Sequence, residues 1–395
     1  MSSDSELKDI REKCQEWLVA IRRHLHRHPE LSDQEQGTQK FIMEKLTELG
    51  VECKPIARTG VVGLIRGRSG GKTVALRADI DALPLQDDKA VPYRSQNPGV
   101  AHACGHDAHT AIALGVARYF SERKDHFRGN VKLLFQPAEE TIGGAQRMVA
   151  EGCMENPRVD YCLGKHVQPY LEVGEVELKS GKLNASTDDI KITVSGKSGH
   201  GAYPEFGVDA ILAAAAVVQG VHSIVSRNVS PLESVVISLG TIQGGTKSNI
   251  ICDEVVLRGT LRTVSEKVRR GVKERLARMV AEVAAAYGAV GSIEISPGYD
   301  ALINEDSVVA LIREICQKEL GPHRVRDKEH PSMGAEDFSF FLTETPGAFY
   351  HLGCGNREKG ITASTHAKDF DLDEECLSLG VFLDTRIILK LLAAN

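Results

Sequence analysis

The chain has 395 residues, of which 42% are hydrophobic and 26% charged, so it can bury a substantial core and is long enough for two domains. Its net charge of -6 comes without long blocks of either sign, which argues against nucleic acid or a membrane surface as partners and favours small molecules. The polar N-terminus lacks the apolar core of a signal peptide, and we find no run of about 18 apolar residues, so we expect a cytoplasmic protein.

The first part of the chain alternates helical and extended patterns. We expect charged helices over residues 5–28 and 35–49, then the apolar strands VVGLI and TVALRADI. After CGHDAH the pattern predicts a helix (TAIALGVARYFSER), a strand (VKLLF), a helix around GGAQRMVA and a strand (VDYCLGKHV). Strands that alternate with helices favour an α/β domain whose mainly parallel sheet is covered by helices.

A different order begins near residue 186. A strand (DDIKITVSG), a helix, two strands (SVVISLGTIQ and DEVVLRGTLRT), a second helix and a last strand (SIEIS) form a ferredoxin-like βαββαβ unit. The earlier alternation then resumes with a helix (DSVVALIREICQKEL), a strand (AFYHLGC) and a final helix from Asp373 onward. We therefore predict a catalytic domain in two parts, residues 1–185 and 298–395, interrupted by an inserted domain of residues 186–297.

Metal-capable side chains follow the ends of the predicted strands or begin the helix after CGHDAH. They are Asp79, Asp81, Cys104, His106, Glu139, Glu140, His166 and His366. Ligands of open α/β sheets bind outside the carboxyl ends of the strands, so we expect these groups to meet on one rim.

Thiolate, imidazole and carboxylate are suitable ligands for first-row divalent metals. The predicted ligands are Cys104, His106, Glu140, His166 and His366. Five ligands suit two ions if Cys104 bridges them, as in co-catalytic hydrolases. We expect Mn or Zn, with Co or Ni also compatible. Glu139 would be the general base, and Asp79 and Asp81 would orient the ligands.

Several neighbouring residues have simpler interpretations. Asp107 is expected to be a helix N-cap rather than a ligand. His109 is either a structural histidine or a group that orients a ligand. The tract RRHLHRHPE is expected to be solvated or structural. The nine cysteines have no regular close spacing, which argues against a disulfide framework, and all except Cys104 are expected to be buried small side chains.

The inserted domain carries its own polar residues. His200 lies in the glycine-rich stretch GKSGHGAYPE, and Asn249 and Arg262 lie in KSNIICDEVVLRGTLRT. Together an imidazole, an amide and a guanidinium could hold a carboxylate and a scissile carbonyl oxygen of a substrate. The alternative is that Asn249 is a turn residue and Arg262 a surface charge.

The chain resembles metallopeptidase family M20, in its amidohydrolase branch of hippurate hydrolases, auxin-conjugate hydrolases and N-acyl-amino-acid deacylases. The resemblance spans nearly the whole chain, through LRADIDALP, HACGHDAHTA, FQPAEE, GKHVQP, SGHGAYPE, GGTKSNII, GTLRT, MGAEDFSFF and THAKDFDLDEE. It implies a dinuclear centre with the ligands and base named above. It also implies that the inserted domain is a lid and a homodimer interface, with His200 acting near the active site of its own or the neighbouring subunit.

Two loops depart from the family pattern. Ala367 and Lys368 follow His366 where relatives usually have serine and proline, and Glu205 follows Pro204 where relatives often have histidine. Both loops could meet the substrate, whereas the metal ligands are unchanged.

The main functional hypothesis is a metal-dependent amidohydrolase that cleaves N-acyl amino acids or short peptide-like conjugates through a metal-activated water, with Glu139 as base and His200 stabilising the oxyanion. A dipeptidase or carboxypeptidase of the same family is the nearest alternative. Two others are a non-catalytic binder of amino-acid conjugates and a metal-free hydrolase with Cys104 as nucleophile and His106 as base.

Overall fold

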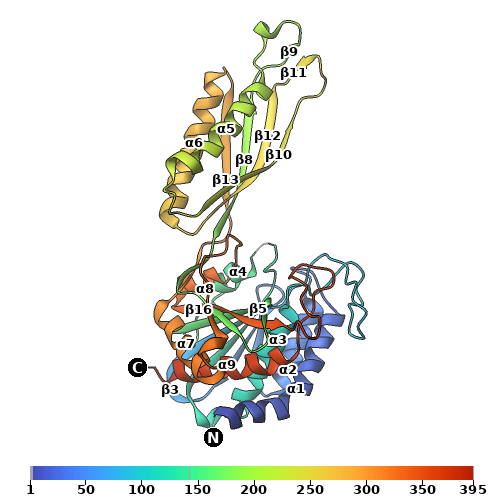
Figure 1. Ribbon diagram of the computed structural model, residues 1–395, viewed down its shortest axis with the longest axis vertical. Helices are drawn as coiled ribbons and strands as arrows, with labels where there is room; N and C mark the ends of the chain where they lie inside the picture. Colours follow the sequence, from blue (N-terminus) through green and yellow to red (C-terminus); the bar gives the residue numbers. More distant parts are fainter. Residues whose placement is uncertain (1–2, 142, 395) are drawn as a thin grey trace. The chain divides into compact units, whose positions relative to one another are not determined.

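The computed structural model describes residues 3–141 and 143–394. The chain divides into two compact units (Figure 1). The larger unit consists of Met1–Gly181, Ile303–Glu329 and Asp337–Asn395, and the smaller unit consists of Lys182–Leu302 and His330–Glu336.

The larger unit is built on an eight-stranded sheet of order β1-β2-β4-β3-β5-β16-β6-β15. Its strands are β1 (Glu52–Ile56), β2 (Gly60–Arg66), β3 (Arg68–Asp79), β4 (Arg128–Gln136), β5 (Tyr161–Glu172), β6 (Val176–Leu178), β15 (Val325–Asp327) and β16 (Gly347–Gly355). The central strands β4, β3, β5 and β16 are parallel, whereas β1 and β2 at one edge pair antiparallel. The predicted mainly parallel sheet is thus confirmed.

Helices cover both faces of this sheet. They are α1 (Ser3–Arg27), α2 (Gln36–Glu48), α3 (His106–Ser121), α4 (Gly144–Ala150), α7 (Asp306–Leu320), α8 (Ser339–Glu344) and α9 (Glu375–Leu392). Helices α1, α3 and α9 pack on one another (Figure 1). Leu76 and Ala78 of β3 belong to the same hydrophobic core. Arg77 lies between those two residues in a strand of period two, so it points to the opposite face. There its guanidinium lies 5.9 Å from the ring centre of Phe338, the residue before α8.

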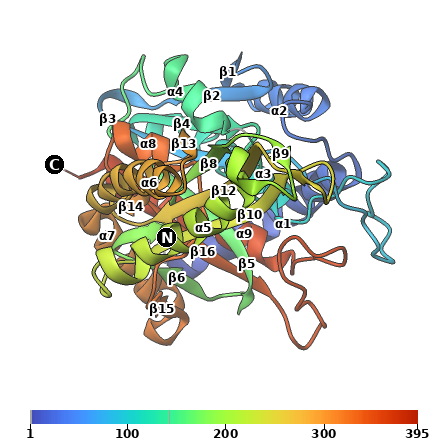
Figure 2. The ribbon, with the colours of Figure 1, turned by 90° about the horizontal axis from the view of Figure 1, so that it is seen from above.

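The smaller unit has the predicted order β8 (Ser186–Ser195), α5 (Ala210–Asn228), β10 (Val235–Gly244), β12 (Glu254–Thr263), α6 (Glu266–Ala286) and β13 (Val290–Pro297). The strands form an antiparallel sheet of order β10-β12-β8-β13, and α5 and α6 lie side by side on it (Figure 2). A separate two-stranded sheet joins β9 (Gly199–His200) to β11 (Ile250–Ile251). Two further short strands, β7 (Gly181–Asn184) and β14 (Leu302–Asn304), lie where the chain passes from one unit to the other.

Both helices of the smaller unit begin at a side-chain cap. Asp209 accepts hydrogen bonds from the amides of Ile211 and Leu212, and Ser265 accepts one from Val268. These caps satisfy amides that have no partner inside the helix. By length and composition α5 could also cross a membrane, but core helices of soluble proteins pass the same test. One side of α5, including Val217 and Val221, is buried in the core of this unit.

Candidate metal centre

The parallel strands bring the predicted metal-capable residues to one rim of the eight-stranded sheet. Strand β3 ends at Asp79, and the turn of residues 137–140 follows β4. His166 was expected at the end of its strand but lies in the middle of the neighbouring β5, which continues to Glu172. Helix α3 begins at His106, directly after Gly105, whose φ is +89°. A side chain at Gly105 would lie 2.3 Å from Val167, so only glycine allows the start of α3 to approach β5 this closely.

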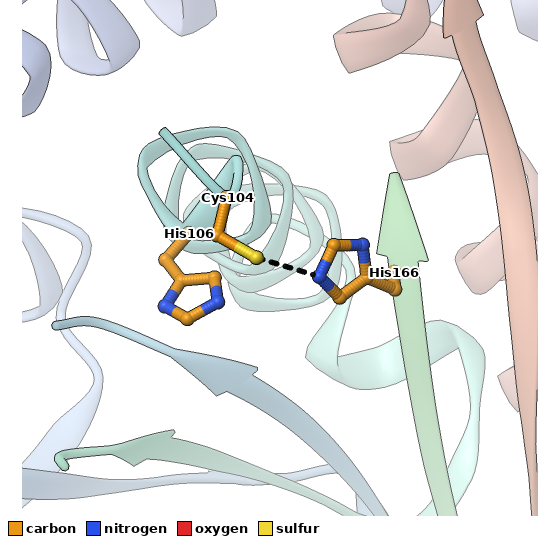
Figure 3. A group of neighbouring side chains, drawn as sticks. All are labelled: Cys104, His106 and His166. Carbon is orange, nitrogen blue, oxygen red and sulfur yellow. Dashed lines mark hydrogen bonds between the residues drawn. The ribbon is translucent and has the colours of Figure 1, made fainter. Parts of the chain in front are cut away.

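Cys104 lies at the junction of two groups of possible ligands. Its Sγ is 3.2 Å from Nε2 of His166, and ligand atoms of Cys104, His106 and His166 all lie within 4.8 Å of one another (Figure 3). A second group contains Cys104, Glu140 and His366, whose ligand atoms also lie within 4.8 Å of one another. Nε2 of His366 is 3.3 Å from a carboxylate oxygen of Glu140. The rim therefore brings together all five residues predicted as ligands, in two groups that share the thiol.

His106 is oriented as a metal ligand would be. Its Nδ1 lies 3.0 Å from the carbonyl oxygen of Asp81 and 3.2 Å from the carboxylate of the same residue. Because a carbonyl only accepts, Nδ1 is the donor, and Nε2 is the nitrogen left to face a metal ion. Among the described residues, the buried Nε2 of His106 has no hydrogen-bond partner, and the buried Oε1 of Glu140 has none apart from its 3.3 Å contact with His366. Such unsatisfied buried atoms are uncommon, and metal ions held by the two ligand groups would satisfy them.

His109, one turn further along α3, has both ring nitrogens occupied. Its Nδ1 is 2.5 Å from the carboxylate of Asp79, and its Nε2 accepts a hydrogen bond of 2.9 Å from the amide of Val167. His109 is therefore a structural residue that connects β3, α3 and β5 beside His166.

The turn after β4 presents two adjacent carboxylates. Glu140 belongs to the group with Cys104 and His366, whereas Glu139 groups with His106 and Glu140 but not with the thiol. The amide of Glu140 donates to Asp81 Oδ2 at 3.0 Å. Ala138 before them has a φ of +53°, which is uncommon for a residue with a side chain. This geometry supports Glu140 as the ligand and leaves Glu139 beside the ligand groups.

Burial and neighbouring charges set the pKa values on the rim. Burial would raise the pKa of Asp79, but Arg77, His106 and His109 hold it well below its usual range. Burial lowers the pKa of His166, which keeps its imidazole neutral. Burial raises the pKa of the Cys104 thiol well above its usual value. A catalytic cysteine has a lowered pKa, so these surroundings argue against Cys104 as a metal-free nucleophile.

Asp107 is not the helix N-cap that the sequence suggested, since that position is Gly105. Asp107 is buried, and its carboxylate accepts a hydrogen bond of 2.9 Å from Arg22 and lies 2.6 Å from Nδ1 of His26. These contacts place His26 in a buried polar cluster, while His28 is exposed. All nine cysteines are free thiols, and seven are buried, whereas Cys14 and Cys53 are only half-buried, contrary to the expectation for them.

The smaller unit brings together two of its three predicted site residues, which are His200 as a catalytic residue and Asn249 and Arg262 as substrate-binding residues. Exposed His200 accepts a hydrogen bond from the amide of Ala202 at 3.0 Å, and Asn249 accepts one through its carbonyl oxygen from Gly201. Arg262 lies near the other end of β12, about 26 Å along the strand from Glu254, and donates to the carbonyl oxygen of Met333. The three residues therefore do not form the single cluster that we expected within this unit.

Two buried residues of the rim were not singled out from the sequence. Arg77 donates to Asp79 Oδ2 at 2.7 Å and to Gln136 at 2.7 Å, and so fixes one of the predicted orienting carboxylates. A charged residue inside the apolar run TVALRADI was a signal for it. Glu35 accepts a hydrogen bond from the amide of Ala138, and no local pattern indicated that contact.

Comparison with known proteins agrees with the resemblance predicted from the motifs. The family described as Peptidase family M20/M25/M40 matches residues 75–390. The chain is 41% identical over 337 residues to an N-acetyl-L-cysteine deacetylase of Bacillus subtilis, which covers 85% of this chain and 80% of the relative. It is 37% identical over 390 residues to thermostable carboxypeptidase 2 of Saccharolobus solfataricus, covering 98% of each.

A solved structure with the same fold is that of a Bacillus subtilis protein described as a dinuclear metal binding peptidase from the M20 family. It matches with a TM-score of 0.83 and 32% identity, and the match covers 96% of this chain and 98% of that chain.

Proposed function

This chain belongs to peptidase family M20/M25/M40, and from that membership and the geometry of its rim we propose that it hydrolyses the amide bond of N-acyl amino acids or short peptide-like conjugates with the help of two divalent metal ions. The observation that carries the proposal is the pair of ligand groups that share Cys104. If the Cys104 thiolate took part in both groups, five side chains would be enough to hold two ions.

The metal-binding residues divide between the two groups. Cys104, His106 and His166 would hold one ion, and Cys104, Glu140 and His366 would hold the other. When bound, such ions acidify a water molecule and polarise the carbonyl group of a substrate, and Mn or Zn suits this ligand set, as do Co and Ni. The support from this structure is the pair of unsatisfied buried atoms on His106 and Glu140.

Glu139 is the general base in this proposal. Its carboxylate lies within 4.8 Å of ligand atoms of His106 and Glu140, where it can take a proton from water and deliver it to the leaving amine. Asp81 keeps His106 in one tautomer, and Asp79 acts on the same region through His109. These contacts prevent the imidazoles from turning away from the metal site.

The smaller unit supplies the groups that recognise the substrate. His200 and the neighbouring Asn249 would contact the scissile carbonyl oxygen and the substrate carboxylate, and Arg262 would add a cation elsewhere on the same unit. We also propose that this unit is a lid and that two copies of the chain form a homodimer through it. The long edge strand β10 supports that assignment, because it carries exposed Val236 and Ile242.

A carboxypeptidase activity is the second candidate, favoured by the carboxypeptidase relative that matches over 98% of the chain. The two activities differ in the group on the carbonyl side of the scissile bond, which is a simple acyl group in one and a peptide in the other. Initial rates on matched N-acetyl, N-benzoyl and dipeptide substrates with the same C-terminal residue separate them.

The deciding experiment compares wild type with Glu139→Gln and Cys104→Ala, each supplied with Mn or Zn. The wild type should hydrolyse N-acyl amino acids and contain two ions per chain. Glu139→Gln should lose turnover by at least about a thousandfold with both ions present, whereas Cys104→Ala should lose metal. Full turnover in Glu139→Gln, or two ions in Cys104→Ala, would refute these roles. Saturable binding without turnover in the wild type would instead favour a non-catalytic binder.

A further inference from the structure

Glu35 is a buried carboxylate that starts a helix without capping it. It occupies the N-cap position of α2, yet its side chain makes no capping hydrogen bond. Glu30 performs that role instead, because its carboxylate accepts hydrogen bonds from the amides of Gly37 at 3.0 Å and Thr38 at 2.7 Å. The carboxylate of Glu35 is thereby available for a contact outside its own helix.

That contact is with the turn that carries the proposed base. Glu35 Oε1 accepts a hydrogen bond of 2.9 Å from the amide of Ala138, the residue before Glu139. Glu35 Oε2 accepts a hydrogen bond of 2.6 Å from the hydroxyl of Thr59, and the side chain of Glu35 is fully buried. Both oxygens are thus fixed, and the one that faces Ala138 has little freedom to move.

A second buried carboxylate holds the other side of Glu139. Asp81 Oδ2 accepts the amide of Glu140 at 3.0 Å and the hydroxyl of Ser32 at 2.7 Å. The amides before and after Glu139 are therefore both bound by carboxylates that are themselves anchored. Between them the backbone has the positive φ of Ala138.

The packing of Pro137 leaves this turn little room to relax. A side chain carbon added to Gly60 would lie 2.8 Å from the ring of Pro137, and one added to Gly144 would lie 1.8 Å from its carbonyl oxygen. Gly60 follows Thr59, so the segment that anchors Glu35 also packs against the turn. The turn is confined by packing and directed by hydrogen bonds.

We propose that Glu35 is a positioning residue, which holds the amide of Ala138 so that Glu139 points toward the attacking water, while Asp81 holds the amide of the metal-site residue Glu140. This role rests on the proposed function of Glu139 as general base. A displacement of about 1 Å in a reacting group can cost about a hundredfold in rate, so a misdirected Glu139 should lower kcat rather than raise KM.

The chemistry of the contact predicts which replacements are tolerated. Burial raises the pKa of Glu35, but either protonation state keeps a lone pair on Oε1 for the amide of Ala138. Glutamine also offers that lone pair, and a hydroxyl can reverse its direction to meet the glutamine amide. Methionine has a similar length and offers no comparable acceptor. The hydrogen bond from the amide of Ala138 should therefore remain in Glu35→Gln and be lost in Glu35→Met.

The test measures kcat, KM, metal content and thermal unfolding of the full-length, metal-loaded enzyme with an N-acetyl amino acid. Glu35→Met should lose about a hundredfold in kcat, with KM within about threefold of wild type and both ions retained. Glu35→Gln should stay within about fivefold of wild type. Thr59→Val removes the anchor of the second oxygen and should lose about fivefold to tenfold in kcat.

Glu30→Met is the matched control, because it removes backbone hydrogen bonds at the start of the same helix, and those bonds go to Gly37 and Thr38 rather than to the turn that carries Glu139. It should lower the unfolding temperature and leave kcat within about threefold of wild type. A folded Glu35→Met with wild-type kcat would overturn the proposal, as would an equal loss in Glu30→Met. If Glu35→Met does not fold, an unchanged kcat in Thr59→Val would overturn it.

The Glu139→Gln variant separates a failure of the proposed general base from a failure of the proposed positioning residue. Activity in Glu139→Gln would refute Glu139 as the base. An inactive Glu139→Gln beside an active Glu35→Met would refute only the role of Glu35.

Discussion

Two adjacent residues of β5, Lys165 and His166, belong to polar clusters of opposite kinds. Lys165 is buried, and its ammonium lies 2.5 Å from Asp384, whose other oxygen accepts the hydroxyl of Tyr350 at 2.7 Å. His166 lies beside Cys104 on the rim, among groups that include unsatisfied buried atoms. The first cluster satisfies its charges internally and stabilises the fold. The second cluster leaves buried polar atoms unsatisfied, which indicates that a ligand binds there.

The largest predicted effect is on metal content and turnover, and it should distinguish His106 from His109. The two histidines lie one turn apart, but only His106 has a ring nitrogen without a hydrogen-bond partner among the described residues. His106→Ala should lose at least one of two bound ions and about a thousandfold or more in turnover, because an imidazole ligand is removed. His109→Asn should keep both ions and lose about tenfold to a hundredfold in kcat, because it orients its neighbours. Metal analysis and steady-state kinetics of the two variants check this. Equal metal loss in both would remove the distinction.

Substitutions in the cluster of Lys165, Asp384 and Tyr350 should change the stability of the fold. Lys165→Met leaves Asp384 buried without its cation, and we expect the free energy of unfolding to fall by about 3–5 kcal/mol. The double variant with Asp384→Leu removes both charges and should recover most of that loss. Urea unfolding of the single and double variants measures the difference. A double variant no more stable than Lys165→Met would show that the pair is not a unit.

Glu177 should show a smaller effect that depends on pH. One of its oxygens accepts the hydroxyl of Tyr170 at 2.7 Å and lies 2.8 Å from Nδ1 of His351. Burial would raise its pKa, but the hydrogen bonds from His351 and Tyr170 lower it to about 2. Because the folded pKa lies below the unfolded value, the stabilisation is complete above about pH 4.5 and disappears as the pH falls to about 2.

Glu177→Gln should therefore cost about 2 kcal/mol near neutral pH, and the difference from wild type should shrink over that acid range. Unfolding temperatures of both proteins between pH 7 and pH 2.5 test this. Glu44→Gln is the control, since its partner Lys40 is exposed and 3.9 Å away, and it should change stability by less than about 0.5 kcal/mol. A difference for Glu177→Gln that stays constant with pH would contradict the account.

The sequence predicted what depends on local periodicity. The inserted unit was predicted in the right order, because alternating strands such as DDIKITVSG and long apolar helices carry their own pattern. The gathering of Cys104, Glu140 and His166 followed from the rule that ligands bind at the carboxyl ends of parallel strands.

Long-range contacts could not be predicted in this way. Asp107 resembles an N-cap locally, but Arg22, 85 residues earlier, pairs with it in the core. The contact of Glu35 could not be predicted either, because its partner Ala138 is 103 residues away. Arg262 was grouped with Asn249 because they are near in sequence, whereas β12 runs between them and carries Arg262 to its other end.

The most direct test of the central claim is anomalous diffraction at the Mn or Zn absorption edge from crystals grown with that metal. We predict two anomalous peaks among the side chains of Cys104, His106, Glu140, His166 and His366, with the thiol of Cys104 next to both. Peaks elsewhere, or a single peak that excludes Cys104, would contradict the claim that this thiol joins two metal sites.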